Sequence, residues 1–103
     1  MSAVYLDYNA TAPVRPEARA AVLAALDAPG NPSSVHAAGR AAHARVEGAR
    51  EAVAALIGAP ASTVVFTSGG TEANALAIGS AVAGGFRRLI VSAVEHDAVI
   101  ESA

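Results

Sequence analysis

A turn of small and hydroxyl residues carries the clearest sign of chemistry in this chain. Residues 67–74 have the sequence TSGGTEAN and follow a short apolar run. If that run is a strand and the residues after the turn begin a helix, the first N–H groups of the helix point outward at the positive end of its dipole. Such a helix start binds anions, so the turn is predicted to hold a phosphate group.

A histidine follows a second apolar run. Residues 88–93 are predicted to form a buried strand, and Glu95 and His96 come soon after it. This strand would bring the imidazole of His96 back to the end of the sheet where the phosphate turn lies. Because histidine titrates near neutral pH, an imidazole at that place could also relay protons.

The elements that position these residues follow from apolar spacing and from glycine and proline signals. Three helices are predicted, from Pro16 to a stop at Gly30, over residues 41–57 and over residues 71–82. Residues 4–14 are predicted to be extended, and another helix to begin near Asp97.

Strands at residues 64–67 and 88–93 would flank the helix over residues 71–82 as a right-handed βαβ unit with parallel strands. The predicted fold class is therefore α/β. Two parallel strands cannot form a stable sheet by themselves, because their faces and edges need cover. We therefore expect the chain to be a piece of a larger α/β protein.

Composition narrows the possible functions. The 103 residues can form at most one domain. The formal net charge of −2 does not indicate a surface for binding nucleic acid or anionic lipid. There is no cysteine for a disulfide or a cysteine-based metal site. His36 and His43 lack neighbouring ligands, so a solvated helix face is expected for them rather than a metal site. With neither a leader nor a membrane span in the sequence, a cytoplasmic protein is expected.

Four local patterns occur together in a particular order. They are residues 5–13 (YLDYNATAP), residues 30–36 (GNPSSVH), residues 67–74 (TSGGTEAN) and the pair Glu95-His96. In this order and spacing the chain resembles the N-terminal part of a cysteine desulfurase, an enzyme of the class V aminotransferase group that uses pyridoxal 5'-phosphate (PLP). The resemblance covers essentially all 103 residues.

The resemblance implies a homodimeric enzyme of fold type I. Residues 1–14 would be an extended N-terminal arm, and residues 15–103 the first portion of the PLP-binding large domain, a three-layer α/β/α structure. Such an enzyme removes sulfur from L-cysteine, leaving L-alanine and a persulfide on an enzyme cysteine. A sulfur-acceptor or scaffold protein then receives the sulfur for iron–sulfur clusters or thio-cofactors.

The resemblance also assigns roles to residues. Gly70 and Thr71 would donate a backbone N–H and a hydroxyl to the PLP phosphate, and His96 would stack on the pyridine ring. Asn9-Ala10-Thr11 would either line the substrate mouth or dock the arm on the dimer.

The chain departs from the family pattern in ways that bear on activity. Gly70 stands where alanine is usual, and Asp97 stands where a basic residue often appears. The chain has neither a lysine to hold the cofactor nor a cysteine to carry sulfur. These 103 residues alone are therefore expected to be inactive.

Other interpretations remain open. Residues 67–74 could be an ordinary strand-to-helix turn with Ser68 or Thr71 as the N-cap, and His96 could cap the next helix. Glu72 is expected to interact with the helix dipole rather than to take part in catalysis. The whole protein could also be a selenocysteine lyase, a small-substrate aminotransferase or a non-enzymatic phosphate-binding module. Neither a G-x-G-x-x-G fingerprint nor a Walker lysine supports the last.

Overall fold

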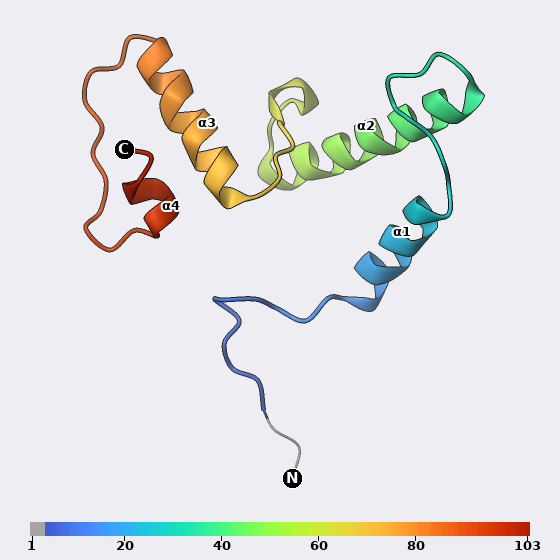
Figure 1. Ribbon diagram of the computed structural model, residues 1–103, viewed down its shortest axis with the longest axis horizontal. Helices are drawn as coiled ribbons and strands as arrows, with labels where there is room; N and C mark the ends of the chain where they lie inside the picture. Colours follow the sequence, from blue (N-terminus) through green and yellow to red (C-terminus); the bar gives the residue numbers. More distant parts are fainter. Residues whose placement is uncertain (1–3) are drawn as a thin grey trace. The chain divides into compact units, whose positions relative to one another are not determined.

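The computed structural model describes residues 4–103, and their regular structure is entirely helical (Figure 1). The chain is divided into two compact units, the first ending at Ser62 and the second comprising Thr63–Ala103. The first unit contains the helices α1 (Pro16–Leu26) and α2 (Ala37–Ile57). The short 3₁₀ helix η1 (Ala61–Thr63) follows α2, and the second unit contains α3 (Gly70–Ala83) and α4 (Asp97–Ile100).

Helix α1 begins where the sequence predicts, at Pro16. Proline suits the first turn because a helix leaves its first N–H groups unpaired in any case. The helix ends at Leu26, four residues before the predicted stop at Gly30, with the N–H of Asp27 bonded to the carbonyl of Leu23. Residues 4–15 form neither helix nor strand and contain a turn at residues 8–10, while residues 1–3 of the predicted arm lie outside the described residues.

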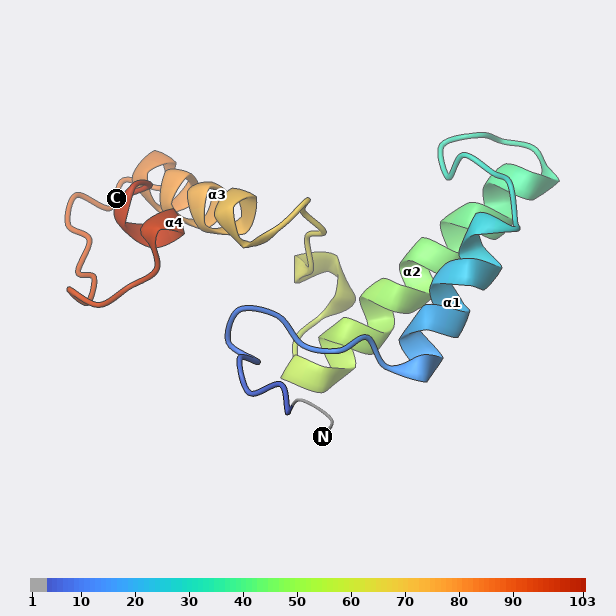
Figure 2. The same cartoon turned by 60° about the horizontal axis from the view of Figure 1, so that its bottom comes forward.

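Helix α2 is the longest element (Figure 2). It begins at Ala37, four residues earlier than predicted. His36 is its N-cap and accepts a hydrogen bond at Nδ1 from the N–H of Gly39, so His36 is not a helix-face residue. The end agrees with the prediction: Gly58 adopts a left-handed conformation with φ 66°, which glycine tolerates without strain.

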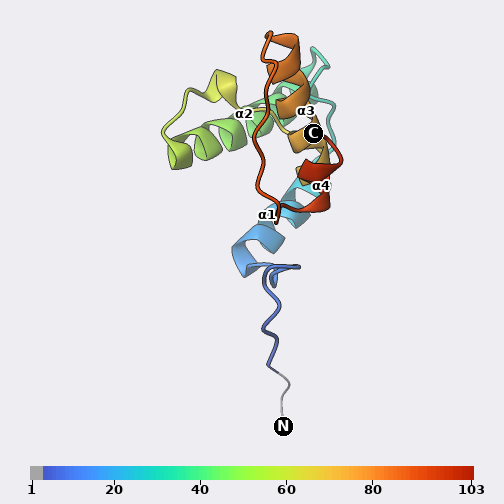
Figure 3. The ribbon, with the colours of Figure 1, turned by 90° about the vertical axis from the view of Figure 1, so that its left-hand side faces the viewer.

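In the second unit, α3 matches its predicted span to within one residue at each end. The chain between α3 and α4 runs back alongside α3 (Figures 1 and 3), and α4 packs against α3. Helix α4 confirms the helix predicted near Asp97, although it is only four residues long.

The prediction of strands at residues 64–67 and 88–93 is wrong in this structure. Both segments have irregular backbone, and Ile90, expected to be buried, is 87% exposed. A strand needs a neighbouring strand to pair with and cover on its faces, and the described residues contain no strand that could pair with either segment. The βαβ unit is therefore absent from the described residues.

Little apolar surface is buried in either unit. Ala54 of α2 and Ala98 of α4 are the buried hydrophobic residues of the described chain, while larger side chains such as Leu56 are exposed. Each unit is thus held together mainly by local hydrogen bonds and helix caps. Its apolar faces are left without partners inside the unit.

Candidate phosphate-binding site

The candidate site is the start of α3, where the sequence predicts phosphate binding. Gly69 is the N-cap residue, with extended backbone (φ 172°, ψ −179°) and no side-chain hydrogen bond to the helix. The interpretation of Ser68 or Thr71 as the N-cap is therefore wrong. A Cβ atom added at Gly69 or Gly70 would have nothing within 4 Å, so the space around this turn is open.

The uncapped start of α3 differs from the starts of α2 and α4. In those two helices a histidine Nδ1 accepts a hydrogen bond from a first-turn N–H, whereas the first turn of α3 lacks such a side-chain acceptor. Helix geometry leaves the N–H groups of Gly70, Thr71 and Glu72 without intrahelical partners. Donors of this kind, beside the Thr71 hydroxyl and in open space, fit the phosphate of a cofactor such as PLP.

The loop before α3 is held by two of its own side chains. The Thr67 hydroxyl donates to the carbonyl oxygen of Gly69 over 3.0 Å. One carboxylate oxygen of Glu72 accepts two hydrogen bonds from Ser68, from the N–H at 2.7 Å and from the hydroxyl at 2.6 Å. These bonds to Ser68 are a role of Glu72 beyond the predicted interaction with the helix dipole.

The contact with Ser68 changes the acidity of Glu72. The hydrogen bond from the Ser68 hydroxyl, followed by that from the Ser68 N–H, lowers the pKa of Glu72 from its ordinary 4.5, while slight desolvation acts in the opposite sense. A lowered pKa in the folded state means that this contact stabilises the loop above pH 4.5. The stabilisation is lost as the pH falls through the lowered value.

We expect Ser68→Ala to return the pKa of Glu72 toward 4.5, because it removes the larger of the two stabilising hydrogen bonds. The measurement is an NMR titration of the Glu72 carboxyl carbon in this chain. Ser102→Ala is the matched control, since the Ser102 hydroxyl donates to the carbonyl of Ala98 instead. An unchanged titration of Glu72 in Ser68→Ala would contradict the hydrogen bonding described here.

His96 lies at the start of α4, in the same unit as the phosphate turn. Its Nδ1 accepts a hydrogen bond from the N–H of Ala98 over 3.0 Å, so the interpretation of His96 as a helix cap is confirmed. Because Nδ1 is the acceptor, the proton of the neutral ring is on Nε2. The cap fixes the Nδ1 edge of the exposed imidazole.

The third predicted group, Asn9-Ala10-Thr11, lies in the first unit. The carbonyl of Asp7 accepts hydrogen bonds from the N–H groups of Ala10 and Thr11, at 3.2 and 3.3 Å. The hydroxyl of Tyr5 is 2.8 Å from the same carbonyl and 3.1 Å from that of Thr11. These bonds form an ordered, exposed turn that presents the three residues.

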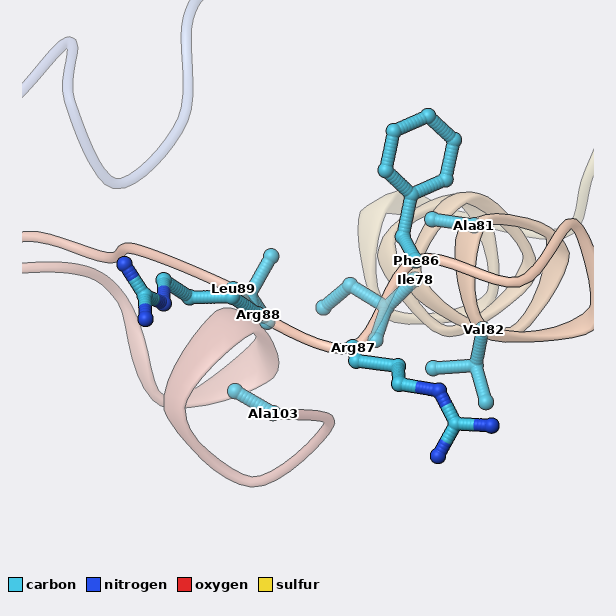
Figure 4. A pocket seen from close by; sticks show the side chains of 8 residues that line it. All are labelled: Ile78, Ala81, Val82, Phe86, Arg87, Arg88, Leu89 and Ala103. Carbon is cyan, nitrogen blue, oxygen red and sulfur yellow. The ribbon is translucent and has the colours of Figure 1, made fainter.

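A separate pocket of about 440 Å³ lies near the other end of α3 (Figure 4). It contains none of the predicted site residues. Its lining is mostly apolar, and the guanidinium groups of Arg87 and Arg88 point in different directions (Figure 4), so they do not converge on one anion. The lining residues are Ile78, Ala81, Val82, Phe86, Arg87, Arg88, Leu89 and Ala103.

Two other kinds of site are absent from the described part of the chain. Residues 4–103 contain no group of three or more His, Cys, Asp or Glu side chains placed to hold a metal ion. Within the same residues, no helix is both long enough and apolar enough to cross a membrane.

Comparison with known proteins identifies the class of protein. The Aminotransferase class-V family matches residues 4–103, and the chain belongs to this family. Among individual relatives, the chain is 51% identical over 104 residues to a cysteine desulfurase of Cereibacter sphaeroides, covering 97% of this chain and 27% of the relative. It is 46% identical over 102 residues to cysteine desulfurase IscS of Dictyoglomus turgidum, covering 95% of this chain and 26% of the relative.

The similarity extends to an enzyme with a different name. Human selenocysteine lyase is 41% identical over 117 residues, covering 93% of this chain and 26% of that protein. The chain thus spans about a quarter of the length of the curated relatives it matches. No solved structure matches it.

Proposed function

We propose that the whole protein carrying these residues is a PLP-dependent cysteine desulfurase. It would convert L-cysteine and an enzyme thiol into L-alanine and an enzyme persulfide. The carbon–sulfur bond of the substrate and one S–H bond break, while a sulfur–sulfur bond and a C–H bond of alanine form, so atoms and electrons balance without an outside oxidant. The observation that carries the proposal is the uncapped start of α3 in a class V aminotransferase chain about half identical to named cysteine desulfurases.

In this proposal the residues of the chain bind and orient the cofactor. The N–H groups of Gly70 and Thr71, with the Thr71 hydroxyl, bind the phosphate at the positive end of the α3 dipole. His96 lies against the pyridine ring, with its orientation set by the bond to Ala98 and with Nε2 able to exchange a proton. When bound, PLP supplies an electron sink that eases bond breaking at the substrate's carbon atoms.

The remaining parts of the proposal concern the whole protein. The turn with Asn9, Ala10 and Thr11 contacts the substrate, and residues 1–14 serve as the N-terminal arm. Residues 15–103 contribute to a fold-type-I large domain, in which residues 64–67 and 88–93 become strands once neighbouring strands pair with them. The exposed apolar side chains of both units agree with such further packing.

The proposed enzyme is a cytoplasmic homodimer that passes sulfur to an acceptor or scaffold protein. Its cofactor-binding lysine and its persulfide cysteine come from outside these 103 residues, because the chain contains neither residue type. Both groups are needed for the proposed reaction.

The test is a turnover assay of the purified whole protein. We expect PLP-dependent release of one alanine for each sulfur removed from L-cysteine, with the enzyme cysteine carrying the sulfur when no reductant is present. Alanine is measured by chromatography and the persulfide by mass spectrometry. A protein that binds PLP but releases neither alanine nor sulfur from cysteine would contradict the proposal.

Selenocysteine lyase is the second candidate because human selenocysteine lyase is 41% identical to this chain. The same assay with L-selenocysteine distinguishes the two. A lyase would release alanine from selenocysteine and leave cysteine nearly untouched, whereas the proposed desulfurase would act on cysteine.

A further inference from the structure

Glu72 holds the predicted phosphate-binding turn, residues 67–74, without bonding to the N–H groups of the first turn of α3. In a capping box, the glutamate at the third helical position accepts a hydrogen bond from the N–H of the N-cap residue. Glu72 occupies that third position in α3, but its carboxylate bonds to Ser68, one residue before the N-cap Gly69. The carboxylate therefore bonds to the loop at Ser68 and not to the N–H of the N-cap residue Gly69.

The two bonds to Ser68 come from different groups, which fixes the loop more closely than one bond would. The N–H of Ser68 positions the backbone, and its hydroxyl positions the side chain, both on the same carboxylate oxygen. The Thr67 hydroxyl adds a third bond within the loop, to the carbonyl of Gly69. With two adjacent glycines at residues 69 and 70, this loop has a large conformational entropy unless such bonds restrict it.

We propose that Glu72 is a positioning residue for cofactor binding. Its two hydrogen bonds with Ser68 keep the loop folded, so that the N–H groups of Gly70 and Thr71 are preorganised for a phosphate. The inference rests on the proposed function, because the phosphate is that of PLP. Glu72 itself does not touch the phosphate in this arrangement. The role depends on an acceptor oxygen at the end of a side chain of this length.

The requirement for an acceptor oxygen defines the variants. Glu72→Gln keeps an oxygen that can accept both hydrogen bonds from Ser68 and removes the charge. Glu72→Ala removes the acceptor altogether. Glu51→Ala, which removes an exposed glutamate from α2, is the matched control for the loss of one surface charge.

The experiment is a titration of the whole apoenzyme with PLP and, separately, with pyridoxal, which lacks the phosphate. Dissociation constants come from the change in absorbance or fluorescence on binding. We expect Glu72→Ala to raise the dissociation constant for PLP about tenfold, or ~1.4 kcal/mol, because a loop that must be ordered on binding weakens affinity. Pyridoxal binding should change less than about twofold, and Glu72→Gln should stay within about threefold of wild type for both ligands.

The outcomes separate this inference from the proposed function. If wild type binds PLP no more tightly than pyridoxal, the phosphate site itself, and with it the proposed function, is wrong. If wild type prefers PLP but Glu72→Ala binds it as wild type does, only the role of Glu72 is wrong. An equal loss of PLP and pyridoxal binding in Glu72→Ala, or a Glu72→Gln variant as weak as Glu72→Ala, would also overturn the inference.

Discussion

Replacing Gly39 by alanine is expected to lower the free energy of unfolding of the whole protein by about 2 kcal/mol. Gly39 is buried in the first turn of α2, and an added Cβ would run into the backbone of Ser34, whose carbonyl carbon lies 2.7 Å away. Backbone cannot move aside as a flexible side chain can. The loop before α2 would have to shift, and the hydrogen bond from the N–H of Gly39 to His36 would be disturbed.

The measurement is urea denaturation, combined with hydrogen exchange at the start of α2. Gly48→Ala is the matched control, because Gly48 lies in the same helix and an added Cβ there has nothing within 4 Å. Alanine in an open helix position should stabilise by about 0.5–1 kcal/mol. Equal effects at positions 39 and 48 would show that the contact with Ser34 does not constrain the loop.

The helices could be predicted from the sequence because their signals are local. Pro16 and Gly58 set ends of α1 and α2 through their own backbone preferences. Apolar spacing does not reveal the start of α2 at Ala37, where His36 is the N-cap. The strand predictions were wrong because strand formation depends on pairing with other segments and not on local signals. Residues 64–67 and 88–93 have strand-like composition, but pairing requires neighbours beyond these two segments.

The same distinction applies to the candidate site. The position of the start of α3 could be predicted from the two glycines, but the sequence also allowed Ser68 or Thr71 as the N-cap, and only the structure shows Gly69 there without a side-chain cap. The hydrogen bonds between Glu72 and Ser68 could not be predicted uniquely, since a glutamate at that position can accept hydrogen bonds from several N–H groups. His96 illustrates a further case, in which the sequence allowed two roles and the structure establishes only the cap.

Replacing His96 by asparagine is expected to separate these two roles. Asparagine is a good N-cap and can replace Nδ1 as acceptor for the N–H of Ala98, but it has no ring to stack on a cofactor. In the whole enzyme we expect His96→Asn to keep α4 intact while weakening PLP binding by up to about tenfold. Turnover should fall about a hundredfold or more if Nε2 also exchanges a proton. PLP titration, hydrogen exchange at α4 and the alanine assay supply the three readouts.

Two further variants complete the experiment. His96→Ala removes both cap and ring, so α4 should lose protection from hydrogen exchange in addition to the effects of His96→Asn, at a cost of about 0.5–2 kcal/mol. His96→Phe keeps a flat ring without a titrating nitrogen, so it should retain more PLP affinity than His96→Asn and still turn over slowly. Wild-type PLP affinity in His96→Asn would contradict stacking, because in that variant the cap remains and the ring is gone. His96 would then act on α4 alone, and the face of the cofactor would need another residue to cover it.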